Sequence, residues 1–210
     1  DKYIWGEVSR ISPEAPVQVV NVIKETYAPG GASNVASNVA ALNSRAFMCG
    51  IAGNDEAKNI LLDELNLRSI NTEGIFIDKD KPTTQKIRVM GKSQQLLRVD
   101  YEKKEHMHRD IEQKIIKFLE KAIAETDAVI ISDYAKGVIT PEICVRLVEM
   151  AKSMSKPVIV DPKPNHRDLY VKCTVITPNN AEASEMANIE DGDDAVLEIG
   201  RNLLKYLNAD

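Results

Sequence analysis

The sequence predicts an α/β fold with a parallel central sheet flanked by helices, and three observations support this class. Short β-branched runs alternate with amphipathic segments, as they do when helices connect parallel strands. A glycine-rich turn opens directly into one of the helices, and polar residues follow three successive strands. With 210 residues, 43% of them hydrophobic, the chain is long enough to bury a core, so we expect a single domain over residues 1–210.

A glycine-rich turn precedes the first predicted helix, which ends at about Asn43. Pro29 fixes one backbone angle, and Gly30 and Gly31 permit close approaches that a Cβ would block. Because a helix begins with unpaired N–H groups and a partial positive charge, a polar ligand can contact the backbone there. Asn34 lies in the first turn beside this opening. The alternative interpretation is a tightly packed helix after a loop.

The other elements of the first half follow from residue type and spacing. Apolar and β-branched runs predict strands, and Asn54 and Asp55 are plausible caps for the helix that follows them. The predicted strands are 5–11, 17–23, 46–52 and 74–77, and the predicted helix is 56–67.

A predicted hairpin then interrupts the alternation, and its strands carry Arg88 and Arg98 among apolar residues. Together with the first two strands it is expected to form a small separate sheet, a lid over one end of the central sheet. One face of these strands is apolar and their edges are open, which predicts a homodimer joined through the lids. The lid strands are expected at about 3–24 and 83–100, with the hairpin turn at Gly91, Lys92 and Ser93.

In the second half the alternation resumes. Thr140 is a typical N-cap residue, and Pro141 is suited to the first turn of the helix that follows. The predicted helices are 111–124, 141–154 and 193–207, and the predicted strands are 128–132, 157–160 and 173–176.

Polar pairs follow the last three predicted strands. Because the carboxyl ends of parallel strands meet at one edge of a sheet, these side chains are expected to lie close together. Lysines beside acids at helix starts suit phosphate groups and Mg²⁺. Each pair alone is equally compatible with a helix cap or a surface ion pair. The pairs are Asp133 with Lys136, Asp161 with Lys163, and Asn179 with Glu182.

Several function classes are disfavoured. A net charge of −5 argues against non-specific nucleic-acid binding, and no apolar run is long enough to span a membrane. The three cysteines are widely spaced in apolar settings, which predicts reduced core residues in a cytoplasmic protein. P-loop and dinucleotide-binding glycine motifs are absent from the sequence. His166 is interpreted as a loop residue rather than a base.

Taken together, these motifs resemble the ribokinase/PfkB-type sugar kinases, and within them the bacterial heptose 7-phosphate kinases. The resemblance covers essentially the whole chain. Two of the matching segments, residues 6–17 and 94–100, are specific to the heptose kinases. The matching segments are residues 6–17, 29–32, 94–100, 132–137, 161–163 and 177–179.

The resemblance implies a ribokinase-like fold and an ATP- and Mg²⁺-dependent reaction. The anomeric hydroxyl of D-glycero-β-D-manno-heptose 7-phosphate would be phosphorylated to the 1,7-bisphosphate, within ADP-heptose and lipopolysaccharide core biosynthesis. Two alternatives stay open: a kinase for another phosphorylated sugar, and a non-catalytic module that binds a sugar phosphate.

The resemblance also implies site residues. Arg98 is the first choice and Arg88 the second for the distal phosphate of the sugar, and Glu182 would act on Mg²⁺ through water. The other residues expected to bind substrate are Asp1, Gly30, Gly31, Asn34, Asp133 and Lys136, and those expected to bind nucleotide or phosphate are Lys163, Asn179 and Glu182.

The sequence departs from the family pattern at both ends. The family's catalytic aspartate belongs to a Gly-Ala-Gly-Asp motif that does not occur here, so the base is expected beyond Asp210. The family's first strand ends in the aspartate that matches Asp1. We therefore expect a piece of a larger domain, inactive by itself, with a nucleotidyltransferase domain fused to it in the whole protein.

Overall fold

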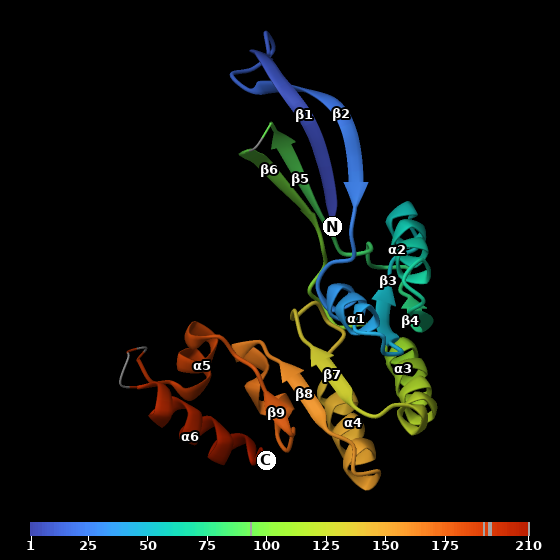
Figure 1. Ribbon diagram of the computed structural model, residues 1–210, viewed down its shortest axis with the longest axis vertical. Helices are drawn as coiled ribbons and strands as arrows, with labels where there is room; N and C mark the ends of the chain where they lie inside the picture. The colour runs from blue at the N-terminus through green and yellow to red at the C-terminus, as the bar shows by residue number, and fades with distance from the viewer. Residues whose placement is uncertain (93, 191, 193–194, 210) are drawn as a thin grey trace. The chain divides into compact units, whose positions relative to one another are not determined.

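The computed structural model describes residues 1–92, 94–190, 192 and 195–209, which form two compact units (Figure 1). The first unit covers Asp1–Lys103 and the second covers Lys104–Asp210. Each unit is described by itself.

A four-stranded sheet dominates the first unit. Its strand order is β2-β1-β5-β6, with β1 and β5 parallel and the outer pairs antiparallel. The predicted separate sheet is therefore present, although Ser93 of the predicted hairpin turn lies outside the described residues. Its strands are β1 (Lys2–Ile11), β2 (Gln18–Tyr27), β5 (Gln85–Gly91) and β6 (Gln94–Tyr101).

The rest of the first unit pairs two parallel strands with two helices. Leu65, Ile70 and Ala46 are buried there, with apolar side chains of both helices packed against them. Asp55 caps the second helix, because its Oδ1 accepts a hydrogen bond from the Lys58 amide at 3.0 Å. The elements are α1 (Ala32–Ala41), β3 (Phe47–Ala52), α2 (Glu56–Asn66) and β4 (Asn71–Ile77).

The second unit contains a parallel sheet with strand order β7-β8-β9. Figure 1 shows these strands side by side, with α4, α5 and α6 around them. The strands are β7 (Val129–Ser132), β8 (Val158–Asp161) and β9 (Val175–Ile176); the helices are α3 (Arg109–Ala122), α4 (Pro141–Ser153), α5 (Asn180–Ala187) and α6 (Val196–Leu207); and the 3₁₀ helices are η1 (Ile123–Glu125) and η2 (Pro164–Tyr170).

A large apolar core surrounds the sheet of the second unit. Val158 and Val160 of β8 pack with Leu207 of α6 and Tyr170 of η2, and all four are fully buried. The predicted cap Thr140 is confirmed, because its hydroxyl accepts a hydrogen bond from the Ile143 amide at 3.2 Å. This packing places Tyr170 of η2 in contact with Asp133 after β7 and with Lys163 after β8.

The structure also bears on the predicted cysteines and helices. Cys144 and Cys173 are buried free thiols, as predicted, and Cys49 is a free thiol of intermediate exposure. The helices α5 and η2 were not predicted, and the predicted helix start at Asp193 lies outside the described residues. Among the described residues, we find no helix with the length and apolar character needed to cross a membrane.

Candidate functional site

The glycine turn lies at the start of α1, as predicted. Gly31 is the N-cap with φ 54° and ψ −131°, and no side chain makes a capping hydrogen bond there. A Cβ on Gly30 would lie only 2.9 Å from Oδ2 of Asp1. The turn therefore uses one glycine for a left-handed backbone angle and the other to admit the Asp1 carboxylate.

Asp1 also contacts the four-stranded sheet. Its Oδ1 forms an ion pair with Nη1 of Arg88 at 3.1 Å, and the Arg88 guanidinium lies 5.2 Å from the ring centre of Tyr3. The ion pair lacks hydrogen-bond geometry, and within the described chain the buried Nη1 has no hydrogen-bond acceptor. The Asp1 carboxylate therefore compensates the charge of this buried nitrogen without forming a hydrogen bond to it.

Arg88 and Arg98 face each other across β5 and β6. Directly opposed residues of an antiparallel pair share a face, and like charges in these positions destabilise the sheet. Nε of Arg98 contacts Oδ1 of Asp100 at 2.9 Å, and Nζ of Lys86 contacts Oδ2 at 3.0 Å. Hydrogen bonding to Lys86 and then to Arg98 lowers the pKa of Asp100. Asp100 is thus shared between Lys86 and Arg98. Together with Arg88, these side chains carry more positive than negative charge.

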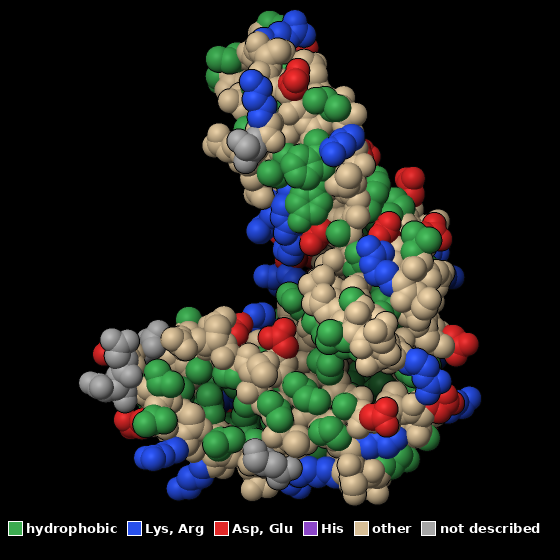
Figure 2. All heavy atoms as spheres, viewed as in Figure 1, with side chains coloured by type: hydrophobic (Ala, Val, Ile, Leu, Met, Phe, Trp, Pro, Cys, Tyr) green, Lys and Arg blue, Asp and Glu red, His purple; other side chains and the backbone are tan. Residues whose placement is uncertain are grey.

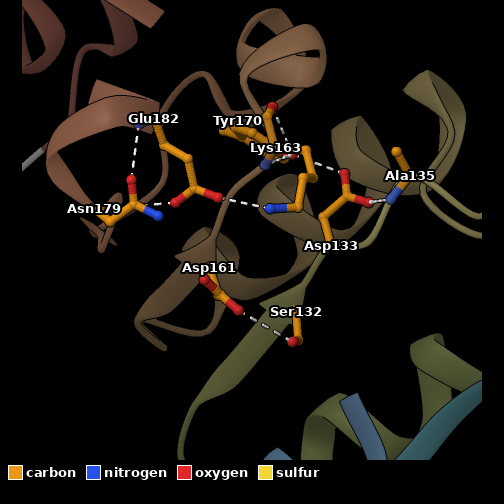
Figure 3. Close-up of polar contacts among 8 residues, drawn as sticks. All are labelled: Ser132, Asp133, Ala135, Asp161, Lys163, Tyr170, Asn179 and Glu182. Atoms are coloured by element: carbon orange, nitrogen blue, oxygen red, sulfur yellow. Dashed lines mark hydrogen bonds and ion pairs between the residues drawn. The ribbon is translucent and has the colours of Figure 1, made fainter. Parts of the chain in front are cut away.

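In the second unit, Asp133 follows β7 and is almost completely buried. Its amide donates to the carbonyl of Asp161 at 3.0 Å, which continues the β7–β8 pairing. Its Oδ1 accepts from the Ala135 amide at 2.7 Å, and its Oδ2 accepts from the Tyr170 hydroxyl at 2.7 Å (Figure 3). Nδ1 of His166 lies 2.6 Å from the same Oδ2. Asp133 therefore organises the loop and has several internal partners.

The Tyr170 hydroxyl links the loops after β7 and β8. It accepts a hydrogen bond from the Lys163 amide at 3.0 Å while donating to Asp133. Burial, together with the hydrogen bond to Asp133, raises the pKa of Tyr170 above its ordinary value. The phenol therefore keeps its proton, which makes Asp133 the acceptor in this pair.

Lys163, Asn179 and Glu182 form one connected group (Figure 3). Nζ of Lys163 contacts Oε1 of Glu182 at 2.6 Å. Asn179 and Glu182 make a reciprocal capping box at the start of α5, with contacts of 2.9 and 3.1 Å. Hydrogen bonding between the two charged groups raises the pKa of Lys163 and lowers that of Glu182. The predicted phosphate-binding residues are therefore brought together, and two of them also begin a helix.

The donor set of Glu182 fits an indirect role toward Mg²⁺. Both carboxylate oxygens already accept a hydrogen bond, one from Lys163 and one from the Asn179 amide. A carboxylate has about four lone-pair sites, so water in the shell of a metal ion can still be bound. Direct ligation would place the cation beside the Lys163 ammonium, which is unfavourable.

Lys136 and His166 line the same pocket of about 290 Å³. His166 was interpreted as a loop residue, whereas it lies in η2 and contacts Asp133. Its partner is 33 residues away in the sequence, so no local pattern identifies the contact.

Residues 3–207 match the family model described as pfkB family carbohydrate kinase. The chain belongs to this family of sugar kinases. Its curated relatives include the Bifunctional protein HldE of Wolinella succinogenes, 44% identical over 98% of this chain, and that of Desulfatibacillum aliphaticivorans, 44% identical over 94%. The chain spans only 43% and 40% of the length of these two proteins. The resemblance to the kinase part of the bifunctional heptose protein is thereby confirmed.

Solved structures confirm the ribokinase-like fold. Phosphofructokinase-2 from Escherichia coli in complex with fructose-6-phosphate matches with a TM-score of 0.73 at 18% identity, over 99% of this chain and 68% of that chain. Arabidopsis thaliana ribokinase complexed with ribose and ATP matches with a TM-score of 0.68 at 16% identity, over 99% and 66%. At these identities the likeness concerns the fold alone.

Proposed function

We propose that this chain is the acceptor-binding part of an ATP-dependent heptose 7-phosphate kinase. The reaction would transfer the terminal phosphoryl group of ATP to the anomeric hydroxyl of D-glycero-β-D-manno-heptose 7-phosphate, giving the 1,7-bisphosphate for ADP-heptose synthesis. Family membership and the relatives named HldE support this function. The observation that carries it is the opposed pair Arg88 and Arg98 beside Asp1.

The first unit supplies groups suited to a sugar phosphate. Asp1 can accept hydrogen bonds from sugar hydroxyls, while the backbone at Gly30 and Gly31 and the side chain of Asn34 offer further polar contacts. A phosphate dianion beside the two opposed arginines would remove their mutual repulsion. Arg98 remains the first choice for this role because its side chain is 52% exposed and accessible to ligand.

The second unit supplies groups suited to the transferring phosphate. Mg²⁺ and ATP would provide charge neutralisation and the phosphoryl donor. Lys163 would stabilise negative charge on phosphate oxygens, with Glu182 holding its ammonium in place, Asn179 holding Glu182, and Glu182 binding a metal-bound water. Asp133 and Lys136 are assigned to the acceptor side. No catalytic base is assigned within residues 1–210.

The test is a coupled ADP-release assay on the full-length protein with heptose 7-phosphate. Arg98→Ala should raise KM for this substrate about tenfold or more, because a charge-assisted contact to the distal phosphate is lost. The control is Arg146→Ala, which removes an exposed arginine of α4. Faster turnover of another sugar phosphate would identify a different kinase, and binding without turnover would favour a non-catalytic module. An unchanged KM in Arg98→Ala would contradict the phosphate assignment.

A homodimer through the lid sheets is proposed for the same protein. Large apolar side chains are exposed on this sheet, among them Ile11, Val22, Ile23 and Leu97 at 69, 56, 67 and 56%. Figure 2 shows hydrophobic side chains between basic ones over these strands, at the top of the view. A strictly monomeric mass by light scattering would refute the dimer. The relatives' name and greater length support a fused nucleotidyltransferase domain as the further partner.

A further inference from the structure

A basic pocket lies beside the loop after β7. It has a volume of about 290 Å³, and within the described part of the chain its lining contains four Lys or His side chains and no Asp or Glu. The basic residues are Lys104, His106, Lys136 and His166. A concave site with this charge favours an anion over a neutral sugar.

Backbone and side-chain contacts fix two walls of the pocket. The Met107 amide donates to the carbonyl of Gly137 at 3.2 Å, which ties the segment carrying Lys104 and His106 to the loop. The loop itself turns at Ala135, whose φ is 50° and whose amide is held by Asp133. The basic side chains therefore extend from a backbone that is already organised.

The hydrogen-bond network assigns the proton on His166. Tyr170 donates to Oδ2 of Asp133, since the Tyr170 oxygen is itself the acceptor for the Lys163 amide. Asp133 thus acts as an acceptor, and its second contact on Oδ2 requires a proton on Nδ1 of His166. Nε2 is then the ring atom left for the pocket.

We propose that His166 is an anion-binding residue and that Asp133 positions it. Nδ1–H donates to the buried carboxylate, and Nε2–H donates to a terminal phosphate group held in the pocket with Lys136 and Lys104. The ammonium groups of Lys136 and Lys104 carry charge, and charged donors make hydrogen bonds to phosphate about twice as strong as neutral ones. The pocket and its basic lining do not depend on the proposed function, whereas the identity of the molecule that carries the phosphate rests on it.

Two substitutions separate binding from structure. In His166→Asn the amide nitrogen lies near the place of Nδ1, so the contact with Asp133 is kept and the pocket-facing donor is lost. In His166→Gln the amide reaches the place of Nε2, so the pocket keeps a donor and Asp133 loses one. His108→Asn is the matched control, because His108 is exposed at the N-cap of α3, where asparagine is well tolerated.

Calorimetric titrations of the full-length protein with inorganic phosphate, heptose 7-phosphate and ADP test the proposal. We expect His166→Asn to weaken binding of inorganic phosphate about tenfold with little change in Tm. His166→Gln should keep most of the affinity and lower Tm, and His108→Asn should bind as the parent does. A parallel loss for heptose 7-phosphate assigns the pocket to the acceptor, and a loss for ADP assigns it to the nucleotide.

Two results would overturn the inference. One is parental affinity for all three ligands in His166→Asn together with a lowered Tm in His166→Gln, which would make the histidine purely structural. The other is a parent protein that binds none of the three. Neither depends on turnover, so failure of the proposed kinase reaction with an intact His166 effect would leave this inference standing.

Discussion

Two helix starts, α1 in the first unit and α5 in the second, are built in opposite ways. The start of α1 uses Gly31 as N-cap and has no side-chain capping bond, whereas α5 begins with a complete capping box from Asn179 and Glu182. At α1, the nearest carboxylate belongs to Asp1, which packs against Gly30 from another part of the chain. At α5, the carboxylate belongs to the helix itself.

The difference separates two ways of handling polar groups. At α1 the amides of Ser33 and Asn34 donate to the carbonyls of Gly30 and Gly31, whereas the capping box of α5 satisfies the Glu182 amide with the Asn179 side chain. Thus α1 begins on backbone contacts beside the Asp1 carboxylate, whereas Glu182 at the start of α5 holds Lys163. Substitutions at the two starts should therefore change different quantities.

The largest effect is expected from Gly30→Ala. The new Cβ would lie 2.9 Å from Oδ2 of Asp1, so the carboxylate must move away from the turn. Loss of a charged hydrogen bond costs about 1.5–3 kcal/mol, which corresponds to roughly 10- to 150-fold in affinity. We expect KM for heptose 7-phosphate to rise by that factor in the ADP-release assay, with little change in unfolding. An unchanged KM would show that the start of α1 does not contact the acceptor.

Gly31→Ala should act mainly on stability. A residue with a Cβ is strained at φ 54° and ψ −131°, which costs about 1–3 kcal/mol. Chemical denaturation should show this loss in the free energy of unfolding. Gly200→Ala is the control: a Cβ there meets nothing within 4 Å, and alanine in helix α6 should stabilise by about 0.5–1 kcal/mol. Equal effects at the two glycines would contradict the argument from backbone angle.

Asn179→Ala should lower the free energy of unfolding by about 1 kcal/mol, because the N-cap hydrogen bond to the Glu182 amide is lost. KM for the sugar phosphate should stay unchanged. Asn59→Ala, at an exposed position within α2, should be neutral or slightly stabilising. A raised KM in Asn179→Ala with parental stability would instead place the asparagine in the acceptor site.

The smallest effect concerns the ion pair between Lys163 and Glu182, worth about 0.2–1 kcal/mol for partly exposed groups. The pKa of Glu182 is lowered, so its contribution is present above the ordinary carboxyl pKa and is lost as pH falls through the folded value. The pKa of Lys163 is raised, so its contribution is present below the ordinary lysine pKa and is lost as pH rises through the folded value. The stability difference between the parent and Glu182→Gln should therefore be largest near neutral pH. A difference that grows in acid would refute the pairing.

Local signals predicted much of the fold. Thr140 and the pair Asn54 and Asp55 were identified as caps because N-cap preference depends only on nearby residues, and Thr140 and Asp55 make the expected bonds. The same kind of signal was present at Asn179 and Glu182, whose spacing is that of a capping box. It was interpreted only as a nucleotide-binding element, and α5 was consequently missed.

Contacts set by tertiary structure could not be predicted. In the pairing of β5 with β6, Val89 is opposite Leu97 and Met90 is opposite Gln95. The bulge between these two pairs leaves Leu96 without an opposite residue. Without this bulge Arg88 would face Leu97 and not Arg98, because a shift of one residue changes the face of the strand. The contact between His166 and Asp133 likewise depends on how η2 packs against the loop after β7.

The single hydroxyl of Tyr170 has a consequence for how this protein can diverge. It joins the loops after β7 and β8 through Asp133 and Lys163, so a mutation that removes the phenol releases both loops together. A substitution that changes the conformation of one loop is therefore expected to affect the other loop as well. New substrate preferences are expected to arise first at pocket positions outside this linkage, such as Lys104 and Asn165, where selection can act on one residue at a time.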